Sequence, residues 1–351
     1  MVYFYFNLDM IISLLEKEIP YIDVRAPIEF AQGALPTSKN LPILNDKERE
    51  KVGKAYKKSG GQAATELGYI LVKDDIRDQR VDDWVNFVNL NPNAHLYCAR
   101  GGQRSEIAIK WLKERGVEIP RIHGGFKTLR NSCLKIINDA SNDNKEWIII
   151  AGKTGSNKTG LVTSVPNAID LEGLANHRGS AFGGYQTPQP TPINFENTLA
   201  IKYLKISQAK IFFEDESRTI GKLVIPENIY NRMNNSKIIL IDEFIEYRIN
   251  HIYQEYVVRA MKNETIVDLS KKLKAQLTKI SKRLGSKHFK IINESLDKAF
   301  ANNSKNCHYK WIEQLLVNYY DKMYEYQISK KLDRCIYNGS WKDVNNFINH
   351  Y

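Results

Sequence analysis

The most constraining feature of the sequence is a fully apolar run that leads directly into a glycine-containing loop. Residues 147–151 (Trp-Ile-Ile-Ile-Ala) are partly β-branched and uncharged, which predicts a buried strand. Residues 152–159 then supply Gly152 and Gly155 and end in Lys158-Thr159, and helix-like residues follow. A strand, a glycine loop and a helix in this order favour an α/β fold for this part of the chain.

The loop at residues 152–159 has the arrangement of a phosphate-binding P-loop. Its backbone N–H groups can ring a phosphate, Lys158 can neutralise it, and the Thr159 hydroxyl can hold Mg²⁺. Asn157 stands where the motif usually has its second glycine, but asparagine tolerates positive φ, so we expect the turn to survive. The alternative is a surface turn with incidental lysines. The predicted phosphate-binding residues are Gly152, Thr154, Gly155, Ser156, Asn157, Lys158 and Thr159.

A second strand, loop and helix surround Cys98. The backbone N–H groups of the loop, the dipole of a following helix capped by Ser105, and two arginines all favour the thiolate. The same loop can hold a tetrahedral oxyanion such as phosphate, selenophosphate or thiosulfate. A buried structural cysteine is the alternative. We expect catalytic roles for Cys98, Arg100 and Arg104, and an anion cradle made of Gly101, Gly102, Gln103 and Ser105.

Two further stretches bring acidic residues to the second half of the chain. Residues 170–180 combine acids, a histidine and an arginine with small residues, which favours a functional loop. Residues 209–213 predict a strand that runs into acids, so that Glu214 or Asp215 can order Mg²⁺ beside Thr159. The alternative for residues 170–180 is a solvated turn with capping residues, and the alternative for the second stretch is a strand end followed by acids that start a helix. The candidates from both stretches are Asp170, Glu172, His177, Arg178, Glu214 and Asp215.

The chain has a net charge of +11, which favours a polyanionic partner such as nucleic acid, although a generally lysine-rich proteome is an alternative. Residues 269–293 contain no acid and carry leucines along one stripe, which predicts a basic amphipathic helix. The alternative is that these lysines and arginines only form a solvent-exposed face of the helix. The candidate nucleic-acid contacts are Lys271, Lys274, Lys279, Lys282, Arg283 and Lys287.

The spacing of the cysteines and the length of the chain limit the classes of protein to which it can belong. The four cysteines form no Cys-x-x-Cys pair, which indicates reduced thiols and argues against a zinc ribbon. No segment has the pattern of an export signal or a membrane span, so a cytoplasmic location is expected. A length of 351 residues favours more than one domain, with a polar boundary near residues 137–145.

Four motifs within residues 1–135 together resemble a rhodanese domain. They are Asp-Val-Arg-x-Pro-x-Glu-Phe at 23–30, the Gly-x-Leu-Pro and Asn-Leu-Pro pieces within 33–42, the loop of Cys98, and His-Gly-Gly-Phe at 123–126. The resemblance implies that Cys98 is the nucleophile that carries sulfur or selenium as a persulfide-type adduct. The Cys-x5-Arg spacing of Cys98 and Arg104 also occurs in cysteine-dependent phosphatases. We expect Asp23 and Arg25 to form a structural ion pair or cap.

The two halves in this order, with the segments 170–180, 195–197 and 214–221, resemble the tRNA 2-selenouridine synthases over essentially the whole chain. The resemblance implies a transferase that converts wobble 2-thiouridine in a tRNA anticodon to 2-selenouridine. Selenophosphate is then the selenium donor, and S-geranylation with geranyl diphosphate precedes selenium transfer. A monomer, bound Mg²⁺ and a selenophosphate-producing enzyme as partner are further expectations.

The expected organisation is α/β throughout, in three parts. These are a rhodanese-like parallel-sheet domain (1–137), a P-loop α/β domain (138–242), and a helical, basic C-terminal region packed on the P-loop domain (243–351). Two other functions stay open at this point. One is a rhodanese sulfurtransferase fused to a P-loop kinase or ATPase that does not act on tRNA. The other is a non-enzymatic tRNA-binding protein.

Overall fold

The structure is a computed structural model that describes residues 8–180, 182–184, 187–302 and 304–351. Within these residues it divides into two compact units. Unit 1 runs to Ala140 and also contains the segment Pro190–Lys205, whereas unit 2 comprises Ser141–Gln189 and Ile206–Tyr351. No helix of the described part is long and apolar enough to cross a membrane.

This division differs from the expected one in two ways. The segment Pro190–Lys205, which the sequence assigns to the P-loop domain, belongs to unit 1. The C-terminal region is not a third unit, because it shares unit 2 with the P-loop part of the chain. The chain therefore enters unit 2, returns to unit 1 for one helix, and enters unit 2 again.

Unit 1 is built on a three-stranded parallel sheet with the order β2-β1-β3. Tyr21 of β1 pairs with Ser38 on one side and with His95 on the other. Its elements are α1 (Leu8–Glu16), β1 (Tyr21–Asp23), α2 (Pro27–Gln32), β2 (Ser38–Asn40), α3 (Asp46–Leu71), α4 (Asp74–Leu90), β3 (His95–Tyr97), α5 (Gln103–Glu114), α6 (Gly125–Ala140) and α9 (Pro192–Lys205).

Helix α9 joins unit 1 through polar contacts and close packing. The Asn197 side-chain amide, which is fully buried, donates to the carbonyl of Ala34 at 2.9 Å. Arg130 of α6 donates to Asn197 at 2.8 Å and forms an ion pair with Glu196. A side chain at Gly33 would collide with Ile193, since a Cβ there would lie 2.4 Å from it. Buried amides are costly unless they are paired, so these contacts fix the helix in place.

Unit 2 is built on a five-stranded parallel sheet with the order β10-β9-β4-β6-β5. The central strand β4 contains the predicted apolar run, and its residues 147–152 are buried. The strands are β4 (Glu146–Gly152), β5 (Ala168–Ile169), β6 (Lys210–Glu214), β9 (Lys237–Ile241) and β10 (Cys335–Gly339), with a separate hairpin of β7 (Thr219–Ile220) and β8 (Leu223–Val224). Parallel sheets in both units confirm the α/β class.

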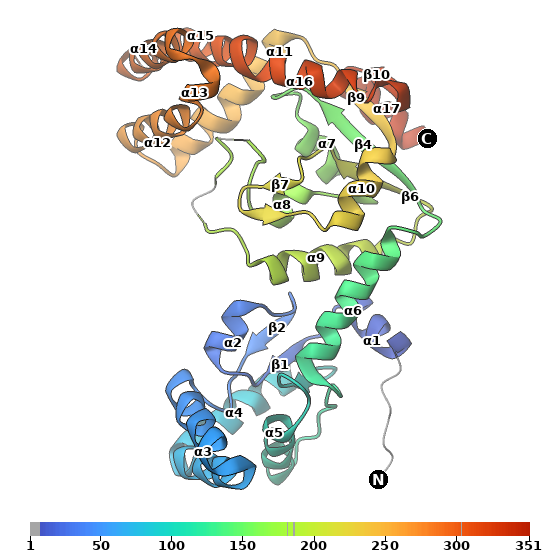
Figure 1. The fold of residues 1–351 in the computed structure, drawn as a ribbon, viewed down its shortest axis with the longest axis vertical. Coiled ribbons are helices and arrows are strands. Elements are labelled where there is room, and N and C mark those ends of the chain that lie inside the picture. Colours follow the sequence, from blue (N-terminus) through green and yellow to red (C-terminus); the bar gives the residue numbers. More distant parts are fainter. Residues whose placement is uncertain (1–7, 181, 185–186, 303) are drawn as a thin grey trace. The chain divides into compact units, whose positions relative to one another are not determined.

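The helices of unit 2 cover this sheet and extend beyond it. Figure 1 shows α12 to α15 grouped together within the unit, in the orange part of the chain. The segments are α7 (Lys158–Ser164), α8 (Leu171–Ala175), α10 (Glu227–Asn235), α11 (Ile245–Tyr253), η1 (Gln254–Val258), η2 (Ala260–Lys262), α12 (Ile266–Lys279), α13 (Ser281–Leu284), α14 (Ser286–Asn302), α15 (Lys305–Leu315), η3 (Leu316–Tyr320), α16 (Asp321–Ser329), η4 (Leu332–Arg334) and α17 (Trp341–His350).

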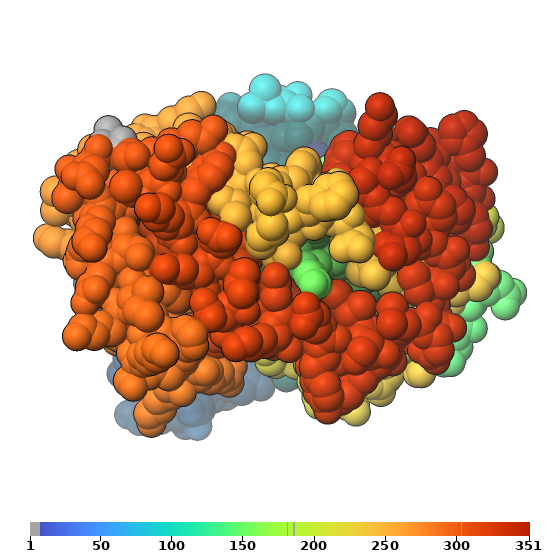
Figure 2. All heavy atoms as spheres, turned by 90° about the horizontal axis from the view of Figure 1, so that it is seen from above, coloured from blue at the N-terminus to red at the C-terminus, as the bar shows by residue number. Residues whose placement is uncertain are grey.

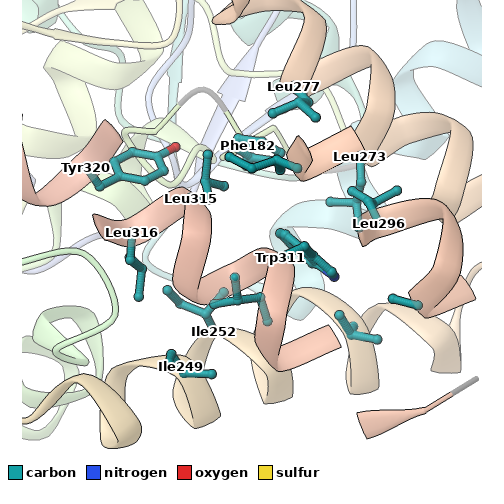
Figure 3. Packing of buried hydrophobic residues seen from close by; sticks show 14 of the residues in the cluster. Phe182, Ile249, Ile252, Leu273, Leu277, Leu296, Trp311, Leu315, Leu316 and Tyr320 are labelled. Carbon is teal, nitrogen blue, oxygen red and sulfur yellow. The ribbon is translucent and has the colours of Figure 1, made fainter. Parts of the chain in front are cut away.

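Two expectations for the C-terminal region are wrong in detail. The basic helix expected over residues 269–293 is three helices: the first has its C-cap at Ile280, and the second has its C-cap at Gly285, whose φ of +81° interrupts the helical path. The region is also not helical to its end, since β10 adds to the sheet beside β9. The unpaired edge of β9 offers backbone hydrogen bonds that no local pattern in the sequence reveals. The predicted apolar stripe is nevertheless buried in one core, whose members from several helices are shown in Figure 3.

Candidate functional site

Cys98 follows β3 and lies in a loop, residues 98–105, that we call the Cys98 loop. The residue is only 3% exposed, and its sulfur lies 3.4 Å from the Ser105 hydroxyl oxygen. Burial raises the pKa of the thiol, but hydrogen bonding with the Ser105 side chain and hydrogen bonds from the N–H groups of Arg100 and Ser105 outweigh it. Together with the charge of Arg104 they lower the pKa of Cys98.

Two glycines let the Cys98 loop press against the turn at residues 122–125. Gly101 has a φ of +66°, and a Cβ on it would lie 2.7 Å from the N atom of Gly124. Gly125 has a φ of +59°, and a Cβ there would lie 2.2 Å from the carbonyl oxygen of Cys98. Any other residue at either position would strain the backbone and push the two loops apart.

The predicted N-cap of the following helix is wrong. Gly102 occupies the N-cap of α5, and Ser105 lies inside the first turn, fully buried. Its hydroxyl donates to the carbonyl of Gly102 at 2.8 Å. Ser105 therefore serves the thiol of Cys98 and the loop backbone instead of capping the helix.

The arginines near Cys98 differ in their partners. Arg104 contacts both carboxylate oxygens of Glu29, at 2.5 Å and 3.1 Å, so its charge is already neutralised. Arg100 is exposed, as are Gly102 and Gln103. The expected ion pair of Asp23 and Arg25 is present, with 2.6 Å between Arg25 Nη2 and Asp23 Oδ2, and is buried.

The P-loop sequence, which we call the Lys158 loop (residues 152–159), adopts the turn that was predicted. Asn157 has a φ of 60° and a ψ of 41°, so it takes the left-handed conformation that the usual glycine would take. The ammonium group of Lys158 is partly buried and donates to the carbonyl of Gly152 at 3.0 Å. Gly152 itself must be small, because a Cβ would lie 2.8 Å from the carbonyl of Ile241.

Three carboxylates from two distant segments of unit 2 converge beside this loop. Glu172, Glu214 and Glu216 place carboxylate oxygens within 4.8 Å of one another and could hold a metal ion. The Thr159 hydroxyl lies 2.8 Å from Glu214 and 3.0 Å from Glu172. We call these three glutamates the carboxylate cluster.

The carboxylate cluster and Lys158 perturb one another. Burial, followed by repulsion from the other carboxylates, raises the pKa of Glu214 well above its usual value. Burial and the charge of Glu172 raise the pKa of Glu216 to about 8. Burial lowers the pKa of Lys158, but Tyr324 and the three acids outweigh burial and raise it to about 12. Since a hydroxyl donates only one hydrogen bond, the site favours a proton or a cation between its carboxylates.

The other predicted acids each have a polar partner outside the carboxylate cluster. Asp215 forms an ion pair with Lys331, with 2.6 Å between Asp215 Oδ1 and Lys331 Nζ, and therefore does not join Thr159 as expected. Asp170 accepts from the N–H of Gly173 at 2.7 Å and caps α8.

Histidine 177 and Arg178 also lie apart from the Thr159 hydroxyl. Arg178 forms an ion pair with Glu255 at 3.0 Å and stacks on the ring of Tyr256. The Nδ1 atom of His177 is buried without a hydrogen-bond partner among the described residues.

Glu216 is the residue that sequence reasoning missed. It follows the end of β6, two positions after Glu214. In extended chain, alternate residues point to the same side, so Glu214 and Glu216 face one way and Asp215 faces the other. This period of two was the signal that could have placed Glu216 in the cluster.

The Lys158 loop and the carboxylate cluster open onto a pocket of about 1070 Å³ in unit 2. Figure 2 shows a hollow in which atoms of the green segment lie between gold and red segments. The predicted residues that line the pocket are Thr154, Gly155, Asn157, Lys158, Thr159, Glu172, Arg178, Glu214, Asp215, Lys279 and Arg283.

The remaining predicted basic residues lie outside the lining of this pocket. Lys271, Lys282 and Lys287 are exposed, and Lys274 forms an ion pair with Asp297.

Comparison with known proteins identifies the family. A family model described as the tRNA 2-selenouridine synthase AAA domain matches residues 145–351. A tRNA 2-selenouridine synthase of Shewanella halifaxensis is 42% identical over 347 residues, covering 95% of both chains. Those of Photobacterium profundum and Sulfurovum sp. are 40% and 41% identical, covering 97% of this chain and 98% and 97% of theirs. Matches of this identity and coverage show that the chain belongs to the tRNA 2-selenouridine synthase family.

Proposed function

We propose that this protein converts 2-thiouridine at the wobble position of a tRNA anticodon to 2-selenouridine, by way of an S-geranylated intermediate. The observation that carries the proposal is the presence, in one chain, of two glycine-containing loops with different reactive groups. The Cys98 loop holds a thiol whose pKa is lowered, and the Lys158 loop holds a partly buried ammonium group at a large pocket. Membership of a synthase family favours this activity over a sulfurtransferase–ATPase fusion and over a tRNA binder without activity.

In the first step, the Lys158 loop binds the diphosphate of geranyl diphosphate. The 2-thio sulfur attacks the first carbon of the geranyl group, the carbon–oxygen bond breaks, and diphosphate leaves while the uridine loses its N3 proton. Lys158 and the N–H groups of the loop stabilise the negative charge that develops on the leaving diphosphate. The raised pKa of Lys158 keeps its ammonium group charged for this role.

The carboxylate cluster fits a magnesium ion. Among the described residues, Oε2 of Glu214 is buried without a hydrogen-bond partner, and the oxygen donors present are those that Mg²⁺ prefers. The Thr159 hydroxyl, Glu172 and Glu214 would hold the ion, with Glu216 in reach. Bound there, Mg²⁺ would neutralise charge on the diphosphate. Asp215 is not part of this proposal because it is paired with Lys331.

In the second step, we assign the selenium donor to the Cys98 loop of a rhodanese-like unit 1. The selenium of selenophosphate bonds to C2 of the uridine, and geranyl thiolate leaves. The Cys98 thiolate then attacks the phosphorus of the bound selenophosphoryl group, the phosphorus–selenium bond breaks to leave 2-selenouridine, and water hydrolyses the resulting S-phosphocysteine to phosphate. Loop N–H groups with Arg100 bind the phosphoryl oxygens during this transfer. Arg104 would contribute once Glu29 releases it.

Basic residues of α12 and α13 would contact the tRNA backbone. Lys279 and Arg283 line the large pocket, and Lys271 and Lys282 are exposed on the same helices. Such contacts position an RNA through its phosphates, while the modified base must leave its stack to reach a pocket. Lys274 is less suited, because Asp297 already neutralises it.

The direct test is mass spectrometry of the nucleosides of a 2-thiouridine-containing tRNA after incubation with the protein. With geranyl diphosphate alone we expect S-geranyl-2-thiouridine and released diphosphate, and with selenophosphate added we expect 2-selenouridine. A protein that leaves the tRNA unchanged but turns over thiosulfate or ATP would refute the proposal in favour of the sulfurtransferase–ATPase alternative.

A further inference from the structure

A small apolar pocket adjoins the large pocket at the Lys158 loop. Its volume is about 30 Å³, counted over the positions that the centre of a water-sized sphere can occupy; on that measure about 10–15 Å³ holds one water, so the pocket has room for a small apolar group. The residues common to the linings of both pockets are Thr154, Ser180, Ile252, Tyr256 and Tyr320. Among the described residues, the rest of the small pocket is lined by large hydrophobic side chains, namely Phe182, Trp311, Ile312, Leu315 and Leu316.

The junction between the two pockets lies at the phosphate-binding loop itself. Thr154 is part of the Lys158 loop and lines both pockets. The buried side chain of Arg248 donates to its carbonyl oxygen at 2.9 Å, which fixes the loop at this edge. A ligand with an anionic head on the loop therefore has an apolar slot beside it. This combination matches an amphiphilic phosphate ester better than a nucleotide, whose base and ribose are polar.

Two irregular helical segments build the walls of the apolar pocket. The π-helical segments η1 and η3 supply Tyr256 from one side and Leu316 with Tyr320 from the other. The π conformation is rare and often occurs at functional sites, because the wider turn redirects side chains. Here both π-helical segments direct side chains to the same pocket.

Phe182 closes the pocket within the core of the helices. Figure 3 shows its ring beside Leu315, with Tyr320 close by, and Trp311 from α15 lies deeper in the same cluster. The residue is 7% exposed, and its carbonyl accepts a weak hydrogen bond from Gln276 at 3.4 Å. Phe182 comes from a loop, so a change in its size alters the pocket without removing a helix.

We propose that the apolar pocket receives the far end of the prenyl chain of the diphosphate donor, and that Phe182 limits the length of chain accepted. This inference rests on the proposed geranyl transfer and deepens it. The chain runs from the Lys158 loop past Tyr256 and Tyr320, and its end meets the aromatic ring of Phe182. A longer chain is rejected because Phe182, packed in the core of the helices, closes this end of the pocket.

The test compares dimethylallyl, geranyl and farnesyl diphosphates as donors for the 2-thiouridine-containing tRNA. In Phe182→Ala we expect the ratio of kcat/KM for farnesyl over geranyl diphosphate to rise at least about tenfold, since each additional buried methylene improves binding by roughly fourfold. Ile312→Phe fills the same pocket from α15 and should shift the preference the opposite way, toward dimethylallyl diphosphate. Opposite shifts from two variants are not expected from general loss of stability.

Two controls separate the pocket from the fold and from the loop. Leu296→Ala removes a buried side chain of the same core that does not line the pocket, so it should lower Tm without altering the preference for chain length. Affinity for inorganic diphosphate should stay within about twofold in Phe182→Ala, because the anion contacts are unchanged.

The outcomes that count against the inference are distinct from those that count against geranyl transfer. Unchanged chain-length preference in folded Phe182→Ala and Ile312→Phe overturns the pocket assignment and leaves the proposed function standing. The assignment is also overturned if Leu296→Ala shifts the preference as strongly. A wild-type protein that transfers none of the three prenyl groups overturns the proposed function, and this inference falls with it.

Discussion

The Cys98 loop and the Lys158 loop share an order of strand, glycine loop and helix, but they hold charge in opposite ways. The Cys98 loop collects donors around a sulfur, and the pKa of that thiol is lowered. The Lys158 loop collects carboxylates around an ammonium group, and the pKa of Lys158 is raised to about 12. One loop thus favours a nucleophile and the other favours a fixed positive charge.

In both loops, carboxylates from elsewhere in the chain interact with the positively charged side chain, which is Arg104 in one loop and Lys158 in the other. Glu29 holds Arg104 in unit 1, and the carboxylate cluster surrounds Lys158 in unit 2. An anionic ligand must therefore displace or outcompete these acids before it gains the full charge of the arginine or lysine. The difference is that Glu29 can be released by moving one ion pair, whereas three glutamates can be neutralised together by a metal ion or protons.

The strongest test of this contrast is Cys98→Ser. We expect selenation to fall by at least about a thousandfold, since a hydroxyl at this position is neither ionised nor a soft nucleophile. Geranylation should stay within about twofold of wild type, because it uses the other loop. Nucleoside mass spectrometry measures both products in one sample. The matched control is Cys133→Ala, which removes a fully buried thiol whose pKa is raised to about 12. Full selenation by Cys98→Ser would remove this residue from the mechanism.

Lys158→Ala should give the next largest effect, on the other reaction. We expect geranylation to fall by about a hundredfold, the usual cost of losing one stabilising group for a leaving oxyanion. Affinity for inorganic diphosphate, measured by calorimetry, should fall with it. Lys153→Ala is the control in the same loop, because that lysine is paired with Glu325 at 3.0 Å. Equal affinity for diphosphate in Lys158→Ala and wild type would place the diphosphate elsewhere.

The carboxylate cluster predicts a dependence of stability on pH that the Cys98 loop does not share. Glu216 has a pKa of about 8 in the folded protein. In the unfolded chain its pKa is about 4.3, so folding takes up a proton between these values and stability falls as pH rises through them. Without divalent cations, we expect Tm to decrease from about pH 5.5 to about pH 8.5, and the decrease to be smaller in Glu216→Gln by an amount equivalent to about 2 kcal/mol.

Two comparisons check the source of this pH effect. Glu246→Gln removes an exposed glutamate of the same unit and should leave the slope of Tm against pH unchanged. Added Mg²⁺ should raise Tm more at high pH than at low pH, because it replaces protons among the carboxylates. A slope that is identical in wild type and Glu216→Gln would mean that the cluster is ionised in the folded protein.

The two loops also differ in how much of their structure could be predicted from the sequence. The Lys158 loop was predictable because its determinants are local: an apolar strand, two glycines and an asparagine that accepts a φ of 60°. In the Cys98 loop the cysteine and the glycines were local signals, but the Arg104–Glu29 pair joins residues 75 positions apart. Nothing in the spacing of either residue indicates which carboxylate an arginine will choose.

Apart from Glu216, whose signal was local, the features that sequence analysis missed depend on pairing between distant segments. Strand β10 exists because β9 has a free edge, and α9 belongs to unit 1 because Asn197 and Ile193 fit against Ala34 and Gly33. The small pocket beside the Lys158 loop likewise needs two π-helical segments that no periodicity in the sequence predicts. Tertiary packing decides these features, and local propensity only permits them.

The smallest expected effect comes from Asn157, where the two loops meet the same backbone requirement with different residues. The Cys98 loop has glycine at its positive-φ position, Gly101, whereas the Lys158 loop has two such positions, occupied by Gly155 and Asn157. Asn157→Gly should change the free energy of unfolding by less than about 1 kcal/mol and keep diphosphate affinity within about threefold, because both residues accept this conformation. Asn157→Val places a β-branched side chain at positive φ and should weaken diphosphate binding by about tenfold. If Asn157→Val binds diphosphate as well as Asn157→Gly, the turn does not depend on a residue that favours the left-handed conformation. The orientation of the loop's backbone N–H groups would then be fixed by surrounding contacts, such as the hydrogen bond from Trp341 Nε1 to the Asn157 carbonyl at 3.0 Å.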